Sequence, residues 1–359
     1  MVREWINTPM DKYTSFSGNN PFASQAKMMF HLDRVMEWQQ TGDTTPIFME
    51  VNLTNKCNLA CKWCINENFR GNEELSQFVV TRLISDFKQM GGKAVTFSGG
   101  GEPTEHPSFA VMAITAYALG VDLGLMTNGA FSDEKREYIG SLFQWARFSI
   151  DTLDVDHYKA WKGVNRLPQV LANIDGLQGK KVRIGANVNV SSEHTVKEVE
   201  ELIFQLYNKV AYIQFRPVLP RYFKKEKIHV NKKVWSFLTK QYENDDRISF
   251  SSDKLDDLVN GNSFPFKVCE GHVFNPIVNA NGDVCVCMYH PNDDRFVFGN
   301  LYKNTFQEIW SSLKRMQVKA TLANLDYEKE CQVCCKLTEL NKFCEFIKHP
   351  EDMRDVNFL

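Results

Sequence analysis

The sequence predicts an α/β protein in which a curved, partial (β/α)6 barrel is followed by a small α+β domain. Three observations lead to this fold. Between residues 46 and 219, short apolar segments alternate with amphipathic helical segments. Residues 265–359 then combine a hairpin pattern with a helical pattern. The chain has 359 residues, 43% of them hydrophobic, which is enough for one large domain and a smaller one.

The alternating segments of residues 46–219 predict parallel strands joined by right-handed helical crossovers. Six strands are too few for a closed eight-stranded barrel, so we expect the sheet to stay open. The predicted strands are Pro46–Leu53, Ala94–Ser98, Asp122–Met126, Ala146–Ile150, Arg183–Val190 and Tyr212–Pro217. The predicted helices are 73–90, 107–119, 133–143, 166–177 and 195–208.

Two further regions flank the barrel pattern. Residues 1–45 are predicted to form an N-terminal extension, with a helix over about 21–40 that packs on the main domain. Residues 220–264 contain the basic stretch RYFKKEKIHVNKK and are interpreted as a solvated linker.

The last region, residues 265–359, is predicted to be a separate domain that holds most of the cysteines. It opens on a hairpin pattern, because Asn281-Gly282 suits a tight turn between two apolar segments. A helix is expected to follow around 305–317.

Charge and targeting signals narrow the class of protein. The chain carries 42 Lys and Arg against 44 Asp and Glu, which favours neither nucleic acid nor a membrane surface as a partner. It has no apolar run of about 20 residues and no secretory signal. We therefore expect a cytoplasmic protein, in whose reducing surroundings the ten cysteines are metal ligands rather than disulfides.

The first cysteine group is Cys57, Cys61 and Cys64, spaced CxxxCxxC directly after the first predicted strand. Thiolates bind [4Fe–4S] clusters, which usually take four cysteine ligands. Three ligands on one loop leave one iron without a protein ligand, and an open position is what a catalytic metal requires. A zinc site and three ordinary loop cysteines are the alternatives.

With Trp63 before its third cysteine, this motif resembles the signature of the radical S-adenosylmethionine (SAM) superfamily. Gly100, Gly101 and Glu102 follow the second strand and match the GGEP motif that contacts the SAM amine in that family. Glycines permit a close approach, and a carboxylate suits a cationic amine. The resemblance implies a partial (β/α)6 TIM barrel and reductive cleavage of SAM to a 5′-deoxyadenosyl radical, which abstracts a substrate hydrogen.

The same resemblance implies further cofactor-binding residues at the ends of later strands, where similar enzymes bind the SAM ribose and carboxylate. These candidates are Asn128, Ser149, Asp151, Asn187 and Arg216. Each alone could be a capping or turn residue, and their order after successive strands is what favours the site. The chemistry also implies an electron donor such as flavodoxin or ferredoxin.

The second cysteine group contains Cys269, Cys287, Cys331 and Cys334, two around the hairpin and two in a CxxC pair. Four such cysteines suffice for a closed auxiliary [4Fe–4S] cluster, with a zinc ribbon as the alternative. The layout resembles the twitch domain, a shortened SPASM domain, and its spacing is similar to that of 2-deoxy-scyllo-inosamine dehydrogenase-type enzymes. It departs from a full SPASM array after Cys334, so one auxiliary cluster is expected.

Cys285, Cys335 and Cys344 are left over, and we interpret them as structural thiols or alternative ligands. A sharper hypothesis makes Cys285 a hydrogen-atom donor to a substrate radical. A thiol in that role would give epimerisation without net oxidation.

The resemblance covers residues 47–217 strongly and 265–340 less strongly, and several functions remain open. The first is oxidation of an alcohol to a ketone in a small polar substrate, such as a sugar, cyclitol or nucleoside derivative. The alternatives are an epimerase, a maturase that modifies a ribosomally made peptide, and an enzyme that activates a partner protein. A non-enzymatic electron carrier would not need the GGEP motif beside an open cluster.

Overall fold

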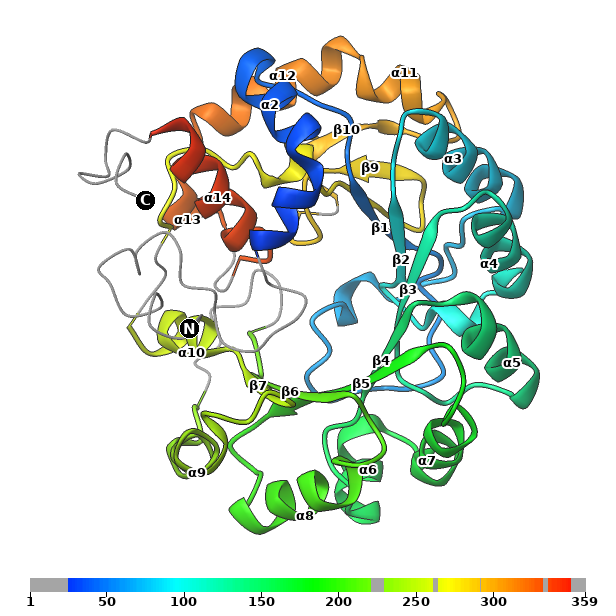
Figure 1. Cartoon of the computed structure of the whole chain (residues 1–359), viewed down its shortest axis with the longest axis vertical. Coiled ribbons are helices and arrows are strands. Elements are labelled where there is room, and N and C mark those ends of the chain that lie inside the picture. Colours follow the sequence, from blue (N-terminus) through cyan, green and yellow to red (C-terminus); the bar gives the residue numbers. More distant parts are fainter. Residues whose placement is uncertain (1–24, 221–228, 261–263, 291, 332–334, 350–359) are drawn as a thin grey trace.

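The computed structural model describes residues 25–220, 229–260, 264–290, 292–331 and 335–349. Its centre is a ten-stranded sheet in the order β10-β9-β8-β1-β2-β3-β4-β5-β6-β7. Figure 1 shows this sheet curving around an open centre, with helices α3, α4, α5, α7 and α8 along its outer side. The predicted α/β class and partial barrel are therefore confirmed.

Strands β1 to β6 are parallel neighbours, and each overlaps a predicted strand. A short seventh strand pairs parallel with β6 and extends the barrel beyond the prediction. The strands are β1 (Phe48–Asn52), β2 (Ala94–Ser98), β3 (Asp122–Thr127), β4 (Trp145–Ser149), β5 (Arg183–Val190), β6 (Tyr212–Pro217) and β7 (Ile248–Phe250).

The two faces of the barrel sheet differ in polarity. Side chains alternate along a strand, so Val51, Phe97 and Phe215 point outward and join the apolar core beneath the helices. Their neighbours Glu50 and Gln214 point inward and are also buried. The outer face therefore supplies the hydrophobic driving force for folding, and the inner face carries polar side chains.

Helices that follow the strands are fixed by capping side chains. Ser76 caps α3, and Thr195 with Glu198 forms a capping box at α8. The predicted helices are observed as α3 (Gln77–Gln89), α4 (Phe109–Ala118), α5 (Asp133–Leu142), α7 (Leu167–Gly176) and α8 (Val196–Leu206). The sequence analysis missed α6 (Val155–Lys162) and the short turns η2 (Glu67–Phe69) and η3 (Pro103–Glu105).

The interpretation of residues 220–264 as a solvated linker is wrong for the part that the structure describes. This part forms α9 (Lys232–Tyr242), β7 and α10 (Ser252–Asn260). Val234, Trp235 and Leu238 are buried in the main core, so α9 covers the sheet as the earlier helices do. Lysines on its exposed side gave the segment a basic composition that hid this pattern. Residues 221–228 of the basic stretch lie outside the described residues.

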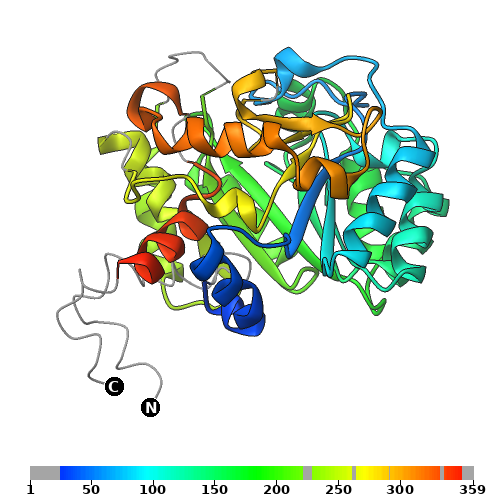
Figure 2. The ribbon, with the colours of Figure 1, turned by 90° about the horizontal axis from the view of Figure 1, so that it is seen from above.

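The N-terminal extension is described from residue 25 onward. It forms η1 (Gln25–His31) and α2 (Leu32–Thr41), and α2 lies beside α14 (Thr338–Lys348) in both views (Figures 1 and 2). Trp38, Phe274 and Phe343 pack together in a second apolar cluster. The extension therefore packs on the C-terminal region, and it also contacts the barrel as predicted, because Arg34 of α2 donates to the carbonyl of Met90 at the end of α3 over 3.2 Å.

The C-terminal region opens with η4 (Gly271–Val273) and the predicted hairpin. Gly282 adopts φ 90° in the turn between β8 (Ile277–Val278) and β9 (Asp283–Cys285), a conformation that favours glycine. Strand β8 also pairs parallel with β1, so one continuous sheet joins the hairpin to the barrel. The remaining elements are η5 (Asp294–Phe296), β10 (Val297–Asn300), α11 (Phe306–Trp310), α12 (Leu313–Ala323), α13 (Tyr327–Glu330) and α14.

The single helix predicted around 305–317 is two helices, α11 and α12, because α11 ends at its C-cap residue Ser311 and the side chain of Ser312 caps the start of α12. Within the described part of the chain, no helix is long and apolar enough to cross a membrane.

Candidate cluster sites

The first cysteine group lies on the loop that follows β1, at the carboxyl edge of the barrel strands. Cys57, Cys61 and Cys64 are each partly exposed. The end of α6 supports this loop, because the amide of Ala60 donates to the carbonyl of Lys162 over 2.8 Å. Sites in α/β barrels gather at this edge, so the loop has the position of a functional site.

Arg70, which the sequence analysis did not single out, lies against all three thiols. Burial opposes its charge, but a hydrogen bond with Cys64 and the nearby Cys57 and Cys61 raise its pKa. Burial also raises the pKa of Cys57 to about 11 and raises that of Cys61. The three thiols therefore share one environment, in which a guanidinium can stabilise negative charge on a bound thiolate cluster. No motif in the sequence marks Arg70.

The glycines after β2 pack directly on the cysteine loop. A Cβ at Gly101 would overlap the carbonyl oxygen of Lys56, and one at Gly100 would overlap the Asn55 side chain. The Gly101 amide donates to the carbonyl of Thr54 over 2.9 Å. The sequence explained these glycines by an approach to SAM, whereas the structure shows a close approach between two loops of the protein.

Glu102 is buried and joins the ends of two strands. Its carboxylate accepts hydrogen bonds from the Thr104 hydroxyl (2.7 Å), the Thr127 hydroxyl (2.7 Å) and the backbone N–H of Asn128 (2.7 Å). Burial raises its pKa, while these hydrogen bonds oppose the rise. The Asn128 side chain in turn donates to Asn58 over 2.7 Å, so Glu102 and Asn128 fix the cysteine loop to β2 and β3.

Asp151 and Trp63, two predicted SAM-binding residues, contact each other. The Trp63 ring nitrogen lies 3.3 Å from the Asp151 carboxylate, which also pairs with Lys162 over 2.6 Å. Both members of this ion pair are buried. Burial disfavours the ammonium of Lys162, but Asp151 and Cys61 raise its pKa overall. Asp151 therefore connects the cysteine loop, through Trp63, to helix α6, through Lys162.

The remaining predicted SAM-binding residues lie on adjacent strands. Ser149 of β4 pairs in register with Asn187 of β5, and Asn189 pairs with Arg216 of β6. The side-chain oxygen of Asn187 is buried without a hydrogen-bond partner among the described residues. These side chains form two successive polar rows along the inner face, at the carboxyl edge of the strands.

The second cysteine group is brought together from three parts of the C-terminal region. Burial, and then the neighbouring thiols, raise the pKa of Cys269, Cys287 and Cys331. Cys335 takes part in each of these interactions, while Cys334 lies outside the described residues. The structure thus adds Cys335 to the group. The Asn341 amide lies 3.5 Å from the Cys269 sulfur and helps to fix it.

Cys285 lies beside this group, since burial, Asp283 and Cys287 raise its pKa, whereas Cys344 packs elsewhere. Cys285 is 0% exposed on β9, and its sulfur lies 3.3 Å from the side-chain nitrogen of Asn279. A thiol sealed in this way gives no support to the hypothesis that Cys285 donates hydrogen to a substrate. Cys344 is buried in the second apolar cluster, with Trp38, Phe274 and Phe343. None of the nine described cysteines forms a disulfide, and no three described His, Cys, Asp or Glu residues converge on a single metal ion.

A polar pocket of about 180 Å³ lies between the two cysteine groups. Asn66 and Arg70 line it from the first loop, and Asn281 and Met288 line it from the hairpin. Asn52, at the end of β1, donates to Asn279 of the hairpin over 3.1 Å. The first cysteine loop and the hairpin region therefore share one pocket rich in amide side chains, and no described cysteine lines it.

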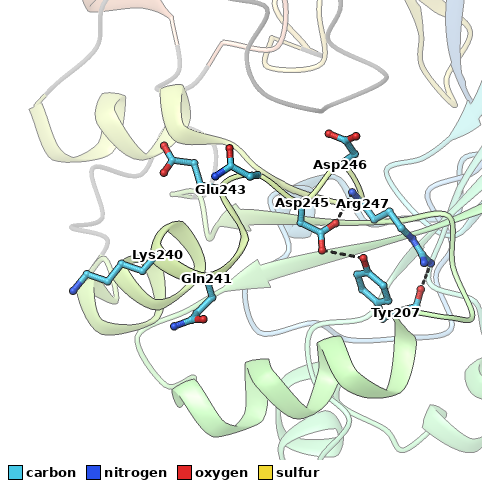
Figure 3. Close-up of a pocket in the computed structure, with 8 residues that line it drawn as sticks. Tyr207, Lys240, Gln241, Glu243, Asp245, Asp246 and Arg247 are labelled. Atoms are coloured by element: carbon cyan, nitrogen blue, oxygen red, sulfur yellow. Dashed lines mark hydrogen bonds between the residues drawn. The ribbon is translucent and has the colours of Figure 1, made fainter. Parts of the chain in front are cut away.

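A larger hollow of about 550 Å³ lies at the opposite edge, where β6 and β7 begin (Figure 3). Tyr207 donates to Asp245 over 2.9 Å, and the Arg247 guanidinium lies 4.1 Å from the Tyr207 ring. Arg247 also donates to the carbonyl of Val210 over 2.7 Å. These contacts hold α8 to the start of β7, so we interpret the hollow as a structural feature.

Comparison with known protein families agrees with this arrangement. The pattern of the radical SAM superfamily matches residues 51–206, and that of the iron–sulfur cluster-binding SPASM domain matches residues 269–335. This chain therefore contains a radical SAM domain followed by a SPASM-type domain. The two domains indicate a SAM-binding [4Fe–4S] cluster and an auxiliary iron–sulfur cluster.

Curated relatives match the barrel region of this chain. A GTP 3′,8-cyclase of Clostridium perfringens (strain SM101 / Type A) is 24% identical over 180 residues, 48% of this chain and 55% of the relative. The tungsten-containing aldehyde ferredoxin oxidoreductase cofactor-modifying protein of Pyrococcus furiosus is 26% identical over 172 residues, 45% of this chain and 48% of the relative. The match spans about half the length of each.

Solved structures share the fold over most of the chain. SuiB of Streptococcus suis bound to precursor peptide SuiA has a TM-score of 0.62 and 17% identity, covering 89% of this chain and 76% of SuiB. Native anSMEcpe with bound AdoMet and a peptide has a TM-score of 0.60 and 17% identity, covering 88% of this chain and 100% of anSMEcpe.

Proposed function

We propose that this enzyme cleaves SAM reductively and abstracts hydrogen from a polar substrate bound between its two cysteine groups. The observation that carries the proposal is the amide-lined pocket, which is bounded by Arg70 of the first site and by Met288, next to Cys287 of the second. A substrate there would lie within reach of both cofactor sites.

The residues present fit both clusters. Cys57, Cys61 and Cys64 would hold the first through three thiolates, with Arg70 balancing their charge. Cys269, Cys287 and Cys331 would hold the second, with Cys334 or Cys335 as the fourth ligand. When bound, the first cluster and SAM supply a radical that removes a hydrogen atom from the substrate.

The chain's own residues would position the substrate and the cofactors and would exclude solvent from the reacting atoms. The glycine loop and Glu102 fix the cysteine loop to the strand ends, while Asn187 offers an amide oxygen on the inner face. In the oxidative reaction that we favour, an alcohol of the substrate would become a ketone, with a net loss of two hydrogen atoms. The auxiliary cluster, held by Cys269, Cys287 and Cys331, would supply the acceptor for the electron that remains after the first hydrogen atom is removed, and the proton would pass to solvent.

A second candidate is modification of a peptide. Both SuiB and anSMEcpe have peptide-bound structures, and their folds cover most of this chain. An epimerase acting through a cysteine donor is the third, and the burial of Cys285 weighs against it.

Anaerobic incubation with SAM and dithionite tests the core of the proposal. The wild-type protein should form 5′-deoxyadenosine and bind about eight irons, from two four-iron clusters. Replacing Cys57, Cys61 and Cys64 with Ala should abolish 5′-deoxyadenosine and leave about half of the iron. Full iron content in this triple variant would refute the ligand assignment.

The fourth auxiliary ligand is tested by Cys334→Ala and Cys335→Ala, with Cys344→Ala as the matched control. The ligand variant should lose about half of the iron because a closed cluster needs four thiolates. Cys344→Ala should keep all of it, since Cys344 packs with apolar side chains elsewhere. Iron loss in Cys344→Ala alone would contradict the assignment of the second group.

Comparing substrates then separates the reactions. Oxidation should give 5′-deoxyadenosine and ketone in equal amounts, whereas solvent deuterium at the product carbon would favour epimerisation. A product formed only from a peptide would favour the second candidate.

A further inference from the structure

The inner face of the barrel carries a buried arginine that has no carboxylate partner among the residues that the structure describes. Arg147 of β4 is 9% exposed. Its guanidinium donates to the side-chain oxygen of Gln214 over 3.0 Å and lies 3.3 Å from the Met126 sulfur. Burial lowers the pKa of Arg147, the phenol of Tyr212 opposes this shift, and no acid among the described residues pairs with the guanidinium.

This arrangement is costly for a protein. A charge taken out of water is normally paired, since its lost hydration must be offset by an opposite charge and by hydrogen bonds. Two other buried cations of this chain follow that rule: Arg315 pairs with Asp43, and Lys162 pairs with Asp151. A buried polar group that breaks the rule is a candidate for function.

The surroundings of Arg147 extend the polar site. Asn187, Gln214 and Ser249 lie in the register row of Ser149, which is the next inward-facing row after Arg147 toward the carboxyl edge. The Asn187 side-chain oxygen and the Ser249 hydroxyl are buried without hydrogen-bond partners in the described part of the chain. A hydroxyl can donate to an anion, so Ser249 complements the guanidinium. Glu50, the carboxylate on this face at β1, is already paired with Lys336.

We propose that Arg147 binds an anionic group of the substrate, a carboxylate or a phosphate. A guanidinium presents five donors in a planar fork that matches either group, and Gln214 occupies part of this fork. The proposed SAM-binding residue Ser149 lies two positions further along β4, about 7 Å toward the carboxyl edge. Arg147 therefore lies deeper than the SAM site, where the far end of a substrate would sit.

The inference rests on the proposed function, because it assigns the anion to the substrate of the proposed reaction. Arg147 itself is not among the residues that line the amide-rich pocket. The test uses the full chain with both clusters reconstituted anaerobically. Inorganic phosphate and acetate are titrated separately at constant ionic strength, and the unfolding temperature is followed. Wild type should show a saturable rise, and the anion that produces it names the group as phosphate or carboxylate.

Arg147→Met should weaken the apparent anion affinity roughly tenfold or more, since it removes a charge-assisted hydrogen bond. Gln214→Glu is the second variant: it places a carboxylate on the guanidinium and should also abolish the response. Arg136→Met is the matched control, because Arg136 lies on the outer side in α5 and pairs with Asp133 over 3.0 Å. Its response should equal that of wild type.

A wild-type protein without a response would overturn the proposal. So would a response that persists in Arg147→Met and Gln214→Glu, because it would show anion binding elsewhere. Formation of 5′-deoxyadenosine by wild type without added anion is measured in the same preparation. A failure of that reaction would count against the proposed function and leave the anion result standing.

Discussion

Arg315 of α12 and Arg147 of β4 are both buried arginines, but their surroundings are opposite. Arg315 is 1% exposed, and its two terminal nitrogens each donate to Asp43 over 2.6 Å. Its guanidinium also lies 3.7 Å from the Trp310 ring. The guanidinium of Arg147 instead donates to the side-chain amide oxygen of Gln214 and to the thioether sulfur of Met126. The first arginine binds α12 to the N-terminal extension, while the second keeps its charge available on the inner face.

The largest expected effect comes from removing the counter-ion of Arg315. Asp43→Ala should lower the free energy of unfolding by about 3–5 kcal/mol, because it leaves a buried guanidinium unpaired. Denaturant unfolding of wild type and variant measures the difference. Asp33→Ala is the matched control, since Asp33 is exposed and lies 3.8 Å from Arg34. Equal effects in the two variants would mean that the Asp43–Arg315 pair contributes no more than a surface contact.

A smaller effect of opposite sign is expected when Arg147 gains a counter-ion. Gln214→Glu should raise the free energy of unfolding by about 1 kcal/mol, because a charged acceptor makes a stronger hydrogen bond than an amide. The same unfolding measurement in phosphate-free buffer checks this. A clear loss of stability in Gln214→Glu would show that Arg147 is already compensated in the folded protein.

The smallest effect is expected for a charged pair at the surface. His157 lies 2.6 Å from Glu198 and is 45% exposed. The hydrogen bond with Glu198 raises its pKa above the ordinary value of 6.5. Because the pKa of His157 is higher in the folded protein than in the unfolded chain, protonated His157 stabilises the folded protein. This stabilisation is complete below about pH 6.5 and is lost as the pH rises through the pKa of the folded protein.

His157→Gln should therefore cost about 0.2–1 kcal/mol at pH 6 and almost nothing at pH 9. Unfolding curves of both proteins at the two pH values give the comparison. A difference that stays constant with pH would assign the effect to packing against Trp161 instead, since the two rings stack with centroids 4.9 Å apart.

Most of the barrel could be predicted from the sequence because its strands are short apolar segments between amphipathic helices. β2, β5 and β6 have the predicted bounds. The seventh strand was missed because Ile248–Phe250 is too short to show an alternating pattern. Helix α6 was missed because it has only eight residues. Tyr158 and Trp161 point inward, but two aromatic side chains in so short a segment do not make a recognisable helical repeat.

The candidate site was less predictable than the fold. Cysteine spacing indicates cluster ligands because three or four thiols within a few residues are otherwise rare. Arg70, Lys162 and Arg147 carry no such signal, since each acts through neighbours that only the folded chain brings near. Cys335 illustrates the same limit, because adjacent cysteines in a sequence do not show which one faces the other three.

The pairing of β8 with β1 determines what happens if the C-terminal region is removed. One edge of β1 pairs with β2, and on the other edge Glu50 and Val51 pair with Ile277 and Val278 of β8. A protein that ended near residue 264 would expose the backbone of β1 as an unprotected edge, where another chain could add a strand. Such a truncated barrel would therefore be prone to aggregate, and the C-terminal region serves as its protective cover as well as a cofactor domain.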